Sequence, residues 1–268
     1  MPAPTTFRAI AEQAAEHGGS VIRAARSRSD LAHEATDKGL PGDYVTAIDL
    51  ESERAVTSVL ASLSPGVPIL AEESGRTAEL GDRYWVVDPL DGTTNFVHRF
   101  PIVGVSVALV DNGAPVAGAV HAPYLGETYG AERGEGAWLT RTGASPERLH
   151  VSGREPGRAV VGTGFPFRHP ARLPRYLRAF GQALERFEDL RRPGAASLDL
   201  SWAAAGVFDG FFELSLAPWD VAAGGLLVIE AGGRVTDWHG GQDWLEGDIL
   251  AGSPEIHGEL LAIADLSG

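Results

Sequence analysis

Cysteine is missing from the 268 residues of the chain. Its absence excludes a disulfide framework, a zinc–thiolate site, an iron–sulfur cluster and a cysteine nucleophile. The eight histidines are scattered singly, without the spacing of a metal-ligand set. A metal site in this chain is therefore expected to use oxygen ligands.

Long apolar runs are also lacking. No run approaches the roughly 18–20 residues that a membrane helix needs, and the first residues, Met1–Thr6, have no basic region followed by an apolar stretch. We therefore expect a cytoplasmic protein that is not inserted in a membrane. The sequence has no Walker-type loop and no G-x-G-x-x-G motif between a clear strand and a helix, so it does not indicate a nucleotide site.

Positive charge is scarce, since 22 Lys and Arg stand against 36 Asp and Glu, for a formal net charge of −14. No basic cluster is dense enough to follow a phosphate backbone, so nucleic acid is not expected as a partner. An acidic protein that acts on an anionic phosphate must invert the local charge, and divalent cations are the usual means.

The apolar pattern predicts one α/β domain of 1–268, with an N-terminal α+β half (1–150) and a C-terminal α/β half (151–268). The polar segment Gly134–Glu155 is the expected seam between them, and the glycine-rich loop Asp37–Asp43, with Lys38, is expected to be mobile. Helices are expected over about 6–26, 49–63, 172–187, 197–205 and 221–231 and from residue 254, and strands over 67–70, 84–87, 102–110, 115–121, 128–131, 159–162 and 210–216.

The most informative segment is Trp85-Val-Val-Asp-Pro-Leu-Asp-Gly-Thr-Thr-Asn-Phe96. A strand ending at Asp88 and a turn through Pro89 would bring Asp91 back toward Asp88, so that both carboxylates share hard cations. The Leu90 carbonyl, free of a strand partner, is a further candidate ligand. Asp-Pro-x-Asp-Gly is also simply a favourable turn sequence, so the motif alone leaves both interpretations open.

The residues after this turn favour a phosphate site. Gly92 permits a backbone conformation that other residues resist. Thr93 and Thr94 then place hydroxyl and amide groups at the start of an expected helix, where an anion is stabilised.

Further acids follow other expected strand or loop ends, namely Asp49, the pair Glu72-Glu73, and Asp220 in Ala217-Pro-Trp-Asp220. Each alone could be a solvated charge, and Asp49 and Asp220 could be helix N-caps. Together they would repel one another unless cations neutralised them.

These motifs, in this order, resemble the inositol monophosphatase family of magnesium-dependent, lithium-sensitive phosphatases over nearly the whole chain. The resemblance implies a layered αβαβα sandwich with two to three Mg²⁺ ions. It assigns one Mg²⁺ to Glu72, Asp88 and the Leu90 carbonyl, a second to Asp88, Asp91 and Asp220, and a weaker third to Glu72. Lys38 would help to organise the third ion or would be only an exposed loop charge.

The resemblance also pairs Asp49 with Thr93 to activate the attacking water. It places the phosphate on the amides of Gly92 and Thr93, and the alcohol hydroxyls near Glu213 and the loop Gly194–Ala196. Ala195 departs from the Thr or Ser that the family often carries, so the hydroxyl contact that such a residue would make with the substrate is not expected here. Arg191 and Arg192 are weaker candidates.

The expected reaction is hydrolysis of small phosphate monoesters, with inositol monophosphate as the first substrate and a homodimer as the expected assembly. Histidinol phosphate and fructose 1,6-bisphosphate remain alternative substrates in the same family. An alternative of another class is a non-catalytic regulatory protein on the same fold. The presence of every metal carboxylate and of the Asp49–Thr93 pair argues against that alternative.

Overall fold

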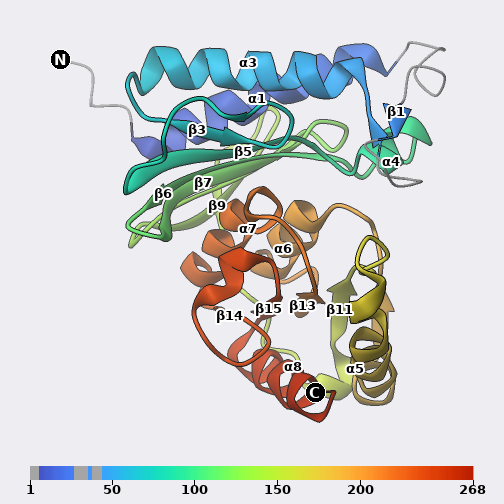
Figure 1. The fold of residues 1–268 in the computed structure, drawn as a ribbon. Coiled ribbons are helices and arrows are strands. Elements are labelled where there is room, and N and C mark those ends of the chain that lie inside the picture. Colours follow the sequence, from blue (N-terminus) through green and yellow to red (C-terminus); the bar gives the residue numbers. More distant parts are fainter. Residues whose placement is uncertain (1–5, 27–35, 38–43, 268) are drawn as a thin grey trace.

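The fold is a stack of five layers in the order helix, sheet, helix, sheet, helix (Figure 1). A computed structural model describes residues 6–26, 36–37 and 44–267. Helices α1 (Phe7–Ala25) and α3 (Ala47–Leu63) form the first layer. Helices α6 (Ala196–Ala204) and α7 (Pro218–Glu230) lie between the sheets, and α5 (Leu173–Arg186) and α8 (Pro254–Leu266) form the last layer. The layered arrangement predicted from the sequence is confirmed.

The first sheet has eight strands in the order β10-β9-β8-β7-β6-β5-β3-β4. All its pairings are antiparallel except that between β3 and β5. Helices cover both faces, so the central strands are buried at consecutive positions rather than at alternate ones. The strands are β3 (Ile69–Ala71), β4 (Gly75–Arg76), β5 (Arg83–Asp91), β6 (Gly104–Asp111), β7 (Ala114–Ala122), β8 (Glu127–Glu132), β9 (Gly136–Arg141) and β10 (Glu147–Arg148).

The second sheet has five strands in the order β12-β11-β13-β15-β14, in which β11 runs parallel to both β12 and β13. Its strands are β11 (Val160–Thr163), β12 (Asp189–Arg191), β13 (Gly210–Glu213), β14 (Arg234–Thr236) and β15 (Ile249–Gly252). The remaining elements are the pair β1 (Thr36–Asp37) and β2 (Tyr44–Val45), the short helix α4 (Thr93–Val97), and three 3₁₀ turns at Pro156–Arg158, Pro170–Arg172 and Asp243–Glu246.

Three apolar clusters separate the layers. The central cluster encloses α6 and α7 between the two sheets, and in α7 every residue from 221 to 228 is buried. A helix that is apolar on all sides belongs inside a protein. The middle helical layer is therefore a rigid support for polar groups at its helix ends.

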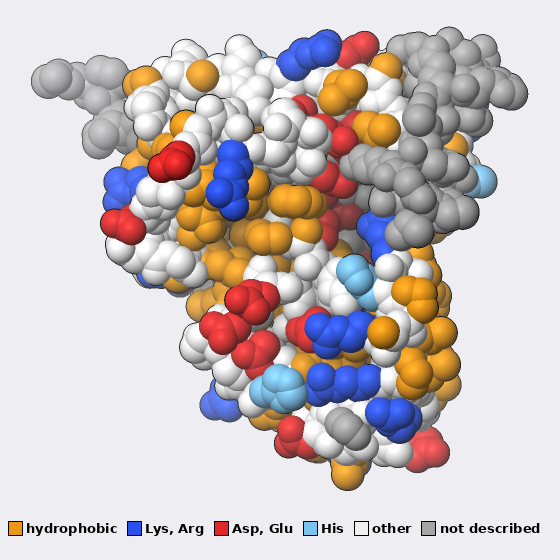
Figure 2. Space-filling view, viewed as in Figure 1, with side chains coloured by type: hydrophobic (Ala, Val, Ile, Leu, Met, Phe, Trp, Pro, Cys, Tyr) orange, Lys and Arg blue, Asp and Glu red, His pale blue; other side chains and the backbone are white. Residues whose placement is uncertain are grey.

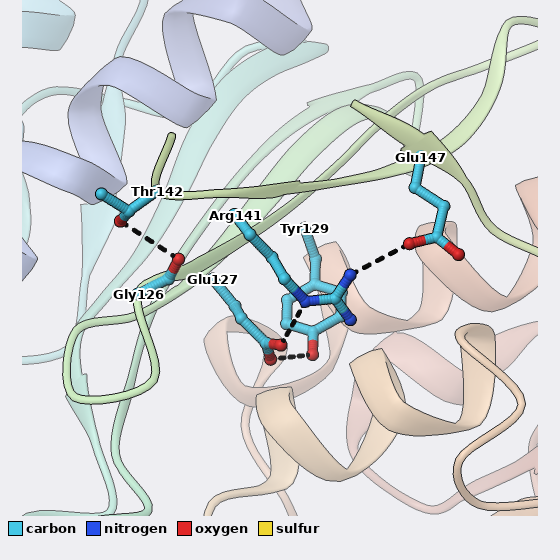
Figure 3. Close-up of polar contacts among 6 residues, drawn as sticks. All are labelled: Gly126, Glu127, Tyr129, Arg141, Thr142 and Glu147. Atoms are coloured by element: carbon cyan, nitrogen blue, oxygen red, sulfur yellow. Dashed lines mark hydrogen bonds and ion pairs between the residues drawn. The ribbon is translucent and has the colours of Figure 1, made fainter. Parts of the chain in front are cut away.

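The expected seam at Gly134–Glu155 contains β9 and β10 of the first sheet. Figure 3 shows the polar contacts that hold these strands to β8. Arg141 makes ion pairs of 3.0 Å with both Glu127 and Glu147, and the Tyr129 hydroxyl donates to Glu127 at 2.6 Å. The first sheet extends to Arg148 and the second begins at Val160, so a division into halves near residue 150 remains a proposal.

The Thr6 side chain caps α1 by accepting the Ala9 amide at 3.2 Å. Of the expected mobile loop, residues 38–43, Lys38 included, lie outside the described residues. Among the described helices, none combines the length and the apolarity needed to cross a membrane.

Candidate active site

A cavity of about 460 Å³ opens between the first sheet, the N-terminal ends of α6 and α7, and the ends of β11 and β13. Figure 2 shows acidic side chains gathered in the middle of the visible face, with basic and histidine side chains below them. The cavity is lined by these predicted residues: Glu72, Asp88, Leu90, Asp91, Gly92, Thr93, Thr94, Gly194, Ala195, Ala196, Glu213 and Asp220. The structure thus brings together residues from both halves of the chain.

Strand β5 carries Asp88 and Asp91 into this cavity. It does not end at Asp88 as expected but continues to Asp91, with an irregularity between the pairs Asp88–Ser106 and Asp91–Gly104. A bulge of this kind redirects side chains. The Leu90 amide donates to Asp88 Oδ1 at 2.9 Å, so the backbone itself holds the first carboxylate in place.

Asp220 reaches the same point from α7. One carboxylate oxygen from each of Asp88, Asp91 and Asp220 lies within 4.8 Å of the other two. Asp220 is not the N-cap of α7, because the helix begins at Pro218 and Asp220 accepts the Ala217 amide at 2.7 Å. The Ser106 hydroxyl donates to the Trp219 carbonyl at 2.9 Å and fixes the helix start against β6.

Burial dominates the electrostatics of this acidic group. It raises the pKa of Asp88, and the neighbouring carboxylates of Glu72, Asp91 and Asp220 raise it further. Burial likewise raises the pKa of Asp220, followed by Asp91 and Glu72. The pKa of Asp91 is raised by burial to about 6, against the lowering effect of hydrogen bonds from Ser197. When all three carboxylates are charged, their burial and repulsion destabilise the folded protein. Bound protons or cations remove this destabilisation.

Glu72 follows β3, the parallel neighbour of β5, and its amide donates to the Val87 carbonyl at 3.1 Å. The ends of these parallel strands place Glu72 beside Asp88. Glu53, buried on α3, accepts the Glu73 amide at 3.0 Å and holds the turn. Glu72 lines the cavity, although among the described residues it lies outside the 4.8 Å group.

Asp49 and Thr93 meet at 3.0 Å between Asp49 Oδ1 and Thr93 Oγ1. Asp49 is the third residue of α3 rather than its N-cap, which is Thr46. Its Oδ2 accepts the Thr46 amide at 2.8 Å and the Thr46 hydroxyl at 2.6 Å. Burial raises the pKa of Asp49, and the hydrogen bonds from Thr46 and Thr93 oppose this. The Thr93 hydroxyl also lies 3.1 Å from the Leu90 carbonyl.

Gly92 begins the short helix α4 with a φ of 89°. A Cβ atom there would lie 3.0 Å from the Ile102 carbonyl oxygen, so both conformation and space require glycine. Asn95 connects this turn to the loop 193–194, because its Nδ2 donates to the carbonyls of Ile102 at 2.7 Å and Pro193 at 2.9 Å.

Glu213 lies at the end of β13 and lines the same cavity as Asp88, Asp91 and Asp220. A Cβ atom at Gly164 would come within 2.1 Å of both its carboxylate oxygens, so Gly164 makes room for this side chain. Burial raises the pKa of Glu213 to about 8, opposed by the charges of Arg192 and Arg168. Arg192, which lines the cavity, also stacks over Phe165, with its Cζ 5.4 Å from the ring centroid.

Sequence reasoning missed three polar residues of the site. Asn95 holds the loop 193–194, Ser197 donates to Asp91 Oδ2 from its amide at 2.8 Å and its hydroxyl at 2.5 Å, and Asp199 lines the cavity. Ser197 and Asp199 stand among apolar residues of the helix predicted over 197–205, which the structure buries on nearly all sides. That was the one signal available, since a buried polar side chain calls for a partner.

Comparison with known proteins shows the family of this chain. The model of the inositol monophosphatase family matches residues 3–267. The putative Nus factor SuhB of Neisseria meningitidis serogroup B is 42% identical over 260 residues, which cover 96% of this chain and 97% of that protein.

Two solved structures show the same fold. The extragenic suppressor protein SuhB of Bartonella henselae superposes with a TM-score of 0.86 at 37% identity, over 95% of this chain and 96% of that one. The inositol monophosphatase of Anabaena (Nostoc) sp. PCC 7120 superposes with a TM-score of 0.84 at 32% identity, over 97% and 95%.

The five layers and the convergent carboxylates define a phosphatase-type fold with an acidic site between its sheets. With the family match over nearly its whole length, the chain belongs to the inositol monophosphatase family.

Proposed function

We propose that the chain hydrolyses small phosphate monoesters with magnesium, and that inositol monophosphate is its preferred substrate. The observation that carries the proposal is the convergence of Asp88, Asp91 and Asp220 within 4.8 Å, beside the Asp49–Thr93 pair. Family membership supports phosphatase chemistry in general, and the site residues are our assignment.

The carboxylate group fits Mg²⁺ because carboxylate and carbonyl oxygens are the ligands that this hard cation prefers. Asp88, Asp91 and Asp220 would hold one ion, and Glu72, Asp88 and the Leu90 carbonyl another, with Glu72 available to a third. When bound, magnesium neutralises the acids, attracts the phosphate and makes water a better nucleophile.

Thr93 and Asp49 would handle the proton of the attacking water. With its hydrogen directed to Asp49 Oδ1, the Thr93 oxygen keeps lone pairs that can accept a hydrogen from water. Thr93 would take this proton and pass its own to Asp49, whose raised pKa suits a general base. The hydroxide that remains then attacks phosphorus, and the ester oxygen leaves with a proton from solvent.

The remaining residues would bind and orient the ester. Gly92, the N-cap of α4, and the first helical residues Thr93 and Thr94 line the cavity, and their amides would bind phosphate oxygens. Glu213 and the loop Gly194–Ala196 would bind the hydroxyl groups of the alcohol. Ala195 lines the cavity and has no hydroxyl group to offer the substrate.

The test is phosphate release by the purified protein with magnesium or with EDTA. The substrates are inositol 1-phosphate, histidinol phosphate, fructose 1,6-bisphosphate and adenosine 3′,5′-bisphosphate. We expect release that depends on magnesium, with the highest kcat/KM for inositol 1-phosphate. A higher value for histidinol phosphate or fructose 1,6-bisphosphate would reassign the substrate within the family.

The matched variant is Asp91→Asn, which keeps the shape of the side chain and removes one anionic metal ligand. We expect a loss of turnover of at least about 10²-fold with a thermal transition like that of the parent. A folded Asp91→Asn variant with near-normal turnover would contradict the proposed metal site.

A second candidate function is a regulatory role with a macromolecular partner. The observation that favours it is the name Nus factor SuhB carried by relatives that cover nearly the whole chain. That name states no enzymatic activity. Absence of phosphate release from every substrate, in folded protein, would move the proposal to this role.

The assembly and compartment remain predictions from the sequence. We propose a homodimer in the cytoplasm, without nucleic acid as a direct ligand. Sedimentation equilibrium of the purified chain, which has a mass of 28.3 kDa, distinguishes a monomer from a dimer.

A further inference from the structure

A second carboxyl group stands near Glu213 and takes no part in the function proposed above. Asp199 lies on α6 and is 1% exposed, yet it lines the active-site cavity. Its Oδ1 is buried without a hydrogen-bond partner among the described residues. A buried polar atom without a partner costs stability and calls for an explanation.

The position of Asp199 excludes a helix-capping role. Its backbone amide donates to the Ala195 carbonyl at 3.0 Å, so Asp199 is already inside the helix. A capping carboxylate would accept an amide from its own helix end, whereas no such bond to Asp199 occurs among the described residues. The helix therefore places the Asp199 side chain at the cavity, and the carboxyl group does not cap the helix.

Glu213 is arranged in a similar way. Trp238 Nε1 donates to its backbone carbonyl at 2.9 Å, and no described residue donates a hydrogen bond to its carboxyl group. The glycine at 164 keeps space for that carboxyl group. Two acidic side chains on adjoining elements, α6 and β13, thus line the cavity, and no described residue donates a hydrogen bond to Asp199 Oδ1 or to the carboxyl group of Glu213.

The surrounding charges indicate which kind of ligand suits Asp199 and Glu213. Burial raises the pKa of Asp199, the charges of Glu213 and Asp91 raise it further, and Arg192 lowers it. A carboxyl group that holds its proton can both donate and accept a hydrogen bond, as a hydroxyl group also can. A neutral ligand with several hydroxyl groups matches such a pair.

We propose that Asp199 is a second substrate-binding carboxyl group, and that Asp199 and Glu213 together bind two neighbouring hydroxyl groups of the alcohol part of the phosphate ester. The inference rests on the proposed function, because the phosphate must be held at the proposed metal site. The site then selects phosphate esters of polyols over those of simple alcohols.

The test compares inositol 1-phosphate with cyclohexyl phosphate, which has the same ring without the other hydroxyl groups. Asp199→Leu is expected to lower kcat/KM for inositol 1-phosphate by about tenfold or more, because the substrate loses a hydrogen-bonding partner. The value for cyclohexyl phosphate should stay within about twofold. The thermal transition should be equal or higher, because an unpartnered polar atom is removed.

The control variant is Ser201→Ala on the same helix. Ser201 is buried, but its hydroxyl donates to the Ser197 carbonyl at 2.7 Å, so its role is structural. It should leave the ratio of the two kcat/KM values unchanged. Equal losses of Asp199→Leu on both substrates, or no loss on either, would overturn the proposal.

Asp199→Asn provides a second variant if the leucine variant does not fold. It should show a smaller loss in the same direction, because an amide imitates the protonated acid. A greater loss with histidinol phosphate than with inositol 1-phosphate would overturn the assignment to hydroxyl groups, since an ammonium group would then be the partner.

Binding separates this inference from the proposed function. Inorganic phosphate with magnesium should bind the parent and Asp199→Leu equally in a calorimetric titration. If neither protein binds phosphate, the proposed function fails. If both bind it and the preference for inositol 1-phosphate over cyclohexyl phosphate is the same in both, only the role of Asp199 fails.

Discussion

Single side chains decide how Asp91 is presented to a cation. Its Oδ2 accepts two hydrogen bonds from Ser197, through the amide at 2.8 Å and the hydroxyl at 2.5 Å. The amide contact belongs to any residue at the start of α6, whereas the hydroxyl contact depends on serine. Ser197 therefore orients a proposed metal ligand without touching the metal.

We expect Ser197→Ala to weaken magnesium binding by about tenfold, the usual effect of losing a hydrogen bond that orients a ligand. Calorimetric titration of the metal-free protein with Mg²⁺ measures it directly, independently of turnover. Ser201→Ala, one turn further along the helix, is the control and should bind Mg²⁺ like the parent. Equal affinity in Ser197→Ala would show that the amide alone suffices to orient Asp91.

At the scale of elements, close packing of α1 against the first sheet depends on glycine. A Cβ atom at Gly19 would lie 2.2 Å from His121 Cδ2. The buried His121 cannot move freely, because its Nδ1 lies 2.9 Å from the Thr128 hydroxyl, which donates to Glu16 at 3.0 Å. Helix α1 and strands β7 and β8 are thus joined by one polar chain behind this glycine.

Gly19→Ala is expected to overpack this contact, whereas Gly258→Ala, in α8, meets no atom within 4 Å. Alanine should therefore stabilise the second site by up to about 1 kcal/mol through helix propensity. The free energy of unfolding of Gly19→Ala should lie about 1–3 kcal/mol below that of Gly258→Ala. Urea titrations of both variants measure the difference, and equal stabilities would mean that His121 shifts freely.

The elements and most of the acidic site were predictable from the sequence. Apolar spacing located the helices, and acids after apolar strands located Asp88, Asp91 and Glu72. The helix caps were harder to predict, since Asp49 and Asp220 are third residues of their helices rather than caps. The positions of these acids depend on where each helix begins, at Ala47 in α3 and at Pro218 in α7, and apolar periodicity does not show where a helix begins.

Ser197 and Asp199 could not be assigned from the sequence for a different physical reason. An amphipathic helix reveals its polar face through periodicity, but α6 is buried on nearly all sides. A polar residue in such a helix has no face that marks it as exposed or functional. Only tertiary structure shows that one contacts Asp91 and the other lines the cavity.

At the scale of the whole molecule, acidity and burial oppose each other. The chain has a net charge of −14, yet its middle layers enclose several carboxyl groups. Asp88, Asp91, Asp220 and Glu213 all have raised pKa values, with burial as the largest cause. The cost of this arrangement is present only when these groups lose their protons without gaining cations.

Stability of the metal-free protein should therefore fall as the pH rises. The folded state keeps protons that the unfolded chain releases near pH 4, and Asp91 and Glu213 lose them only near pH 6 and pH 8. Between these limits unfolding releases protons, so each titrating group lowers the stability by roughly 1 kcal/mol per pH unit.

Magnesium replaces the protons, and should raise the thermal transition more at pH 8 than at pH 5.5. Scanning calorimetry with EDTA or Mg²⁺ measures this, with Asp88→Asn expected to flatten the pH dependence and the exposed Glu155→Gln to leave it unchanged. A magnesium effect of equal size at both pH values would mean that the ions bind elsewhere than at the buried carboxyl groups.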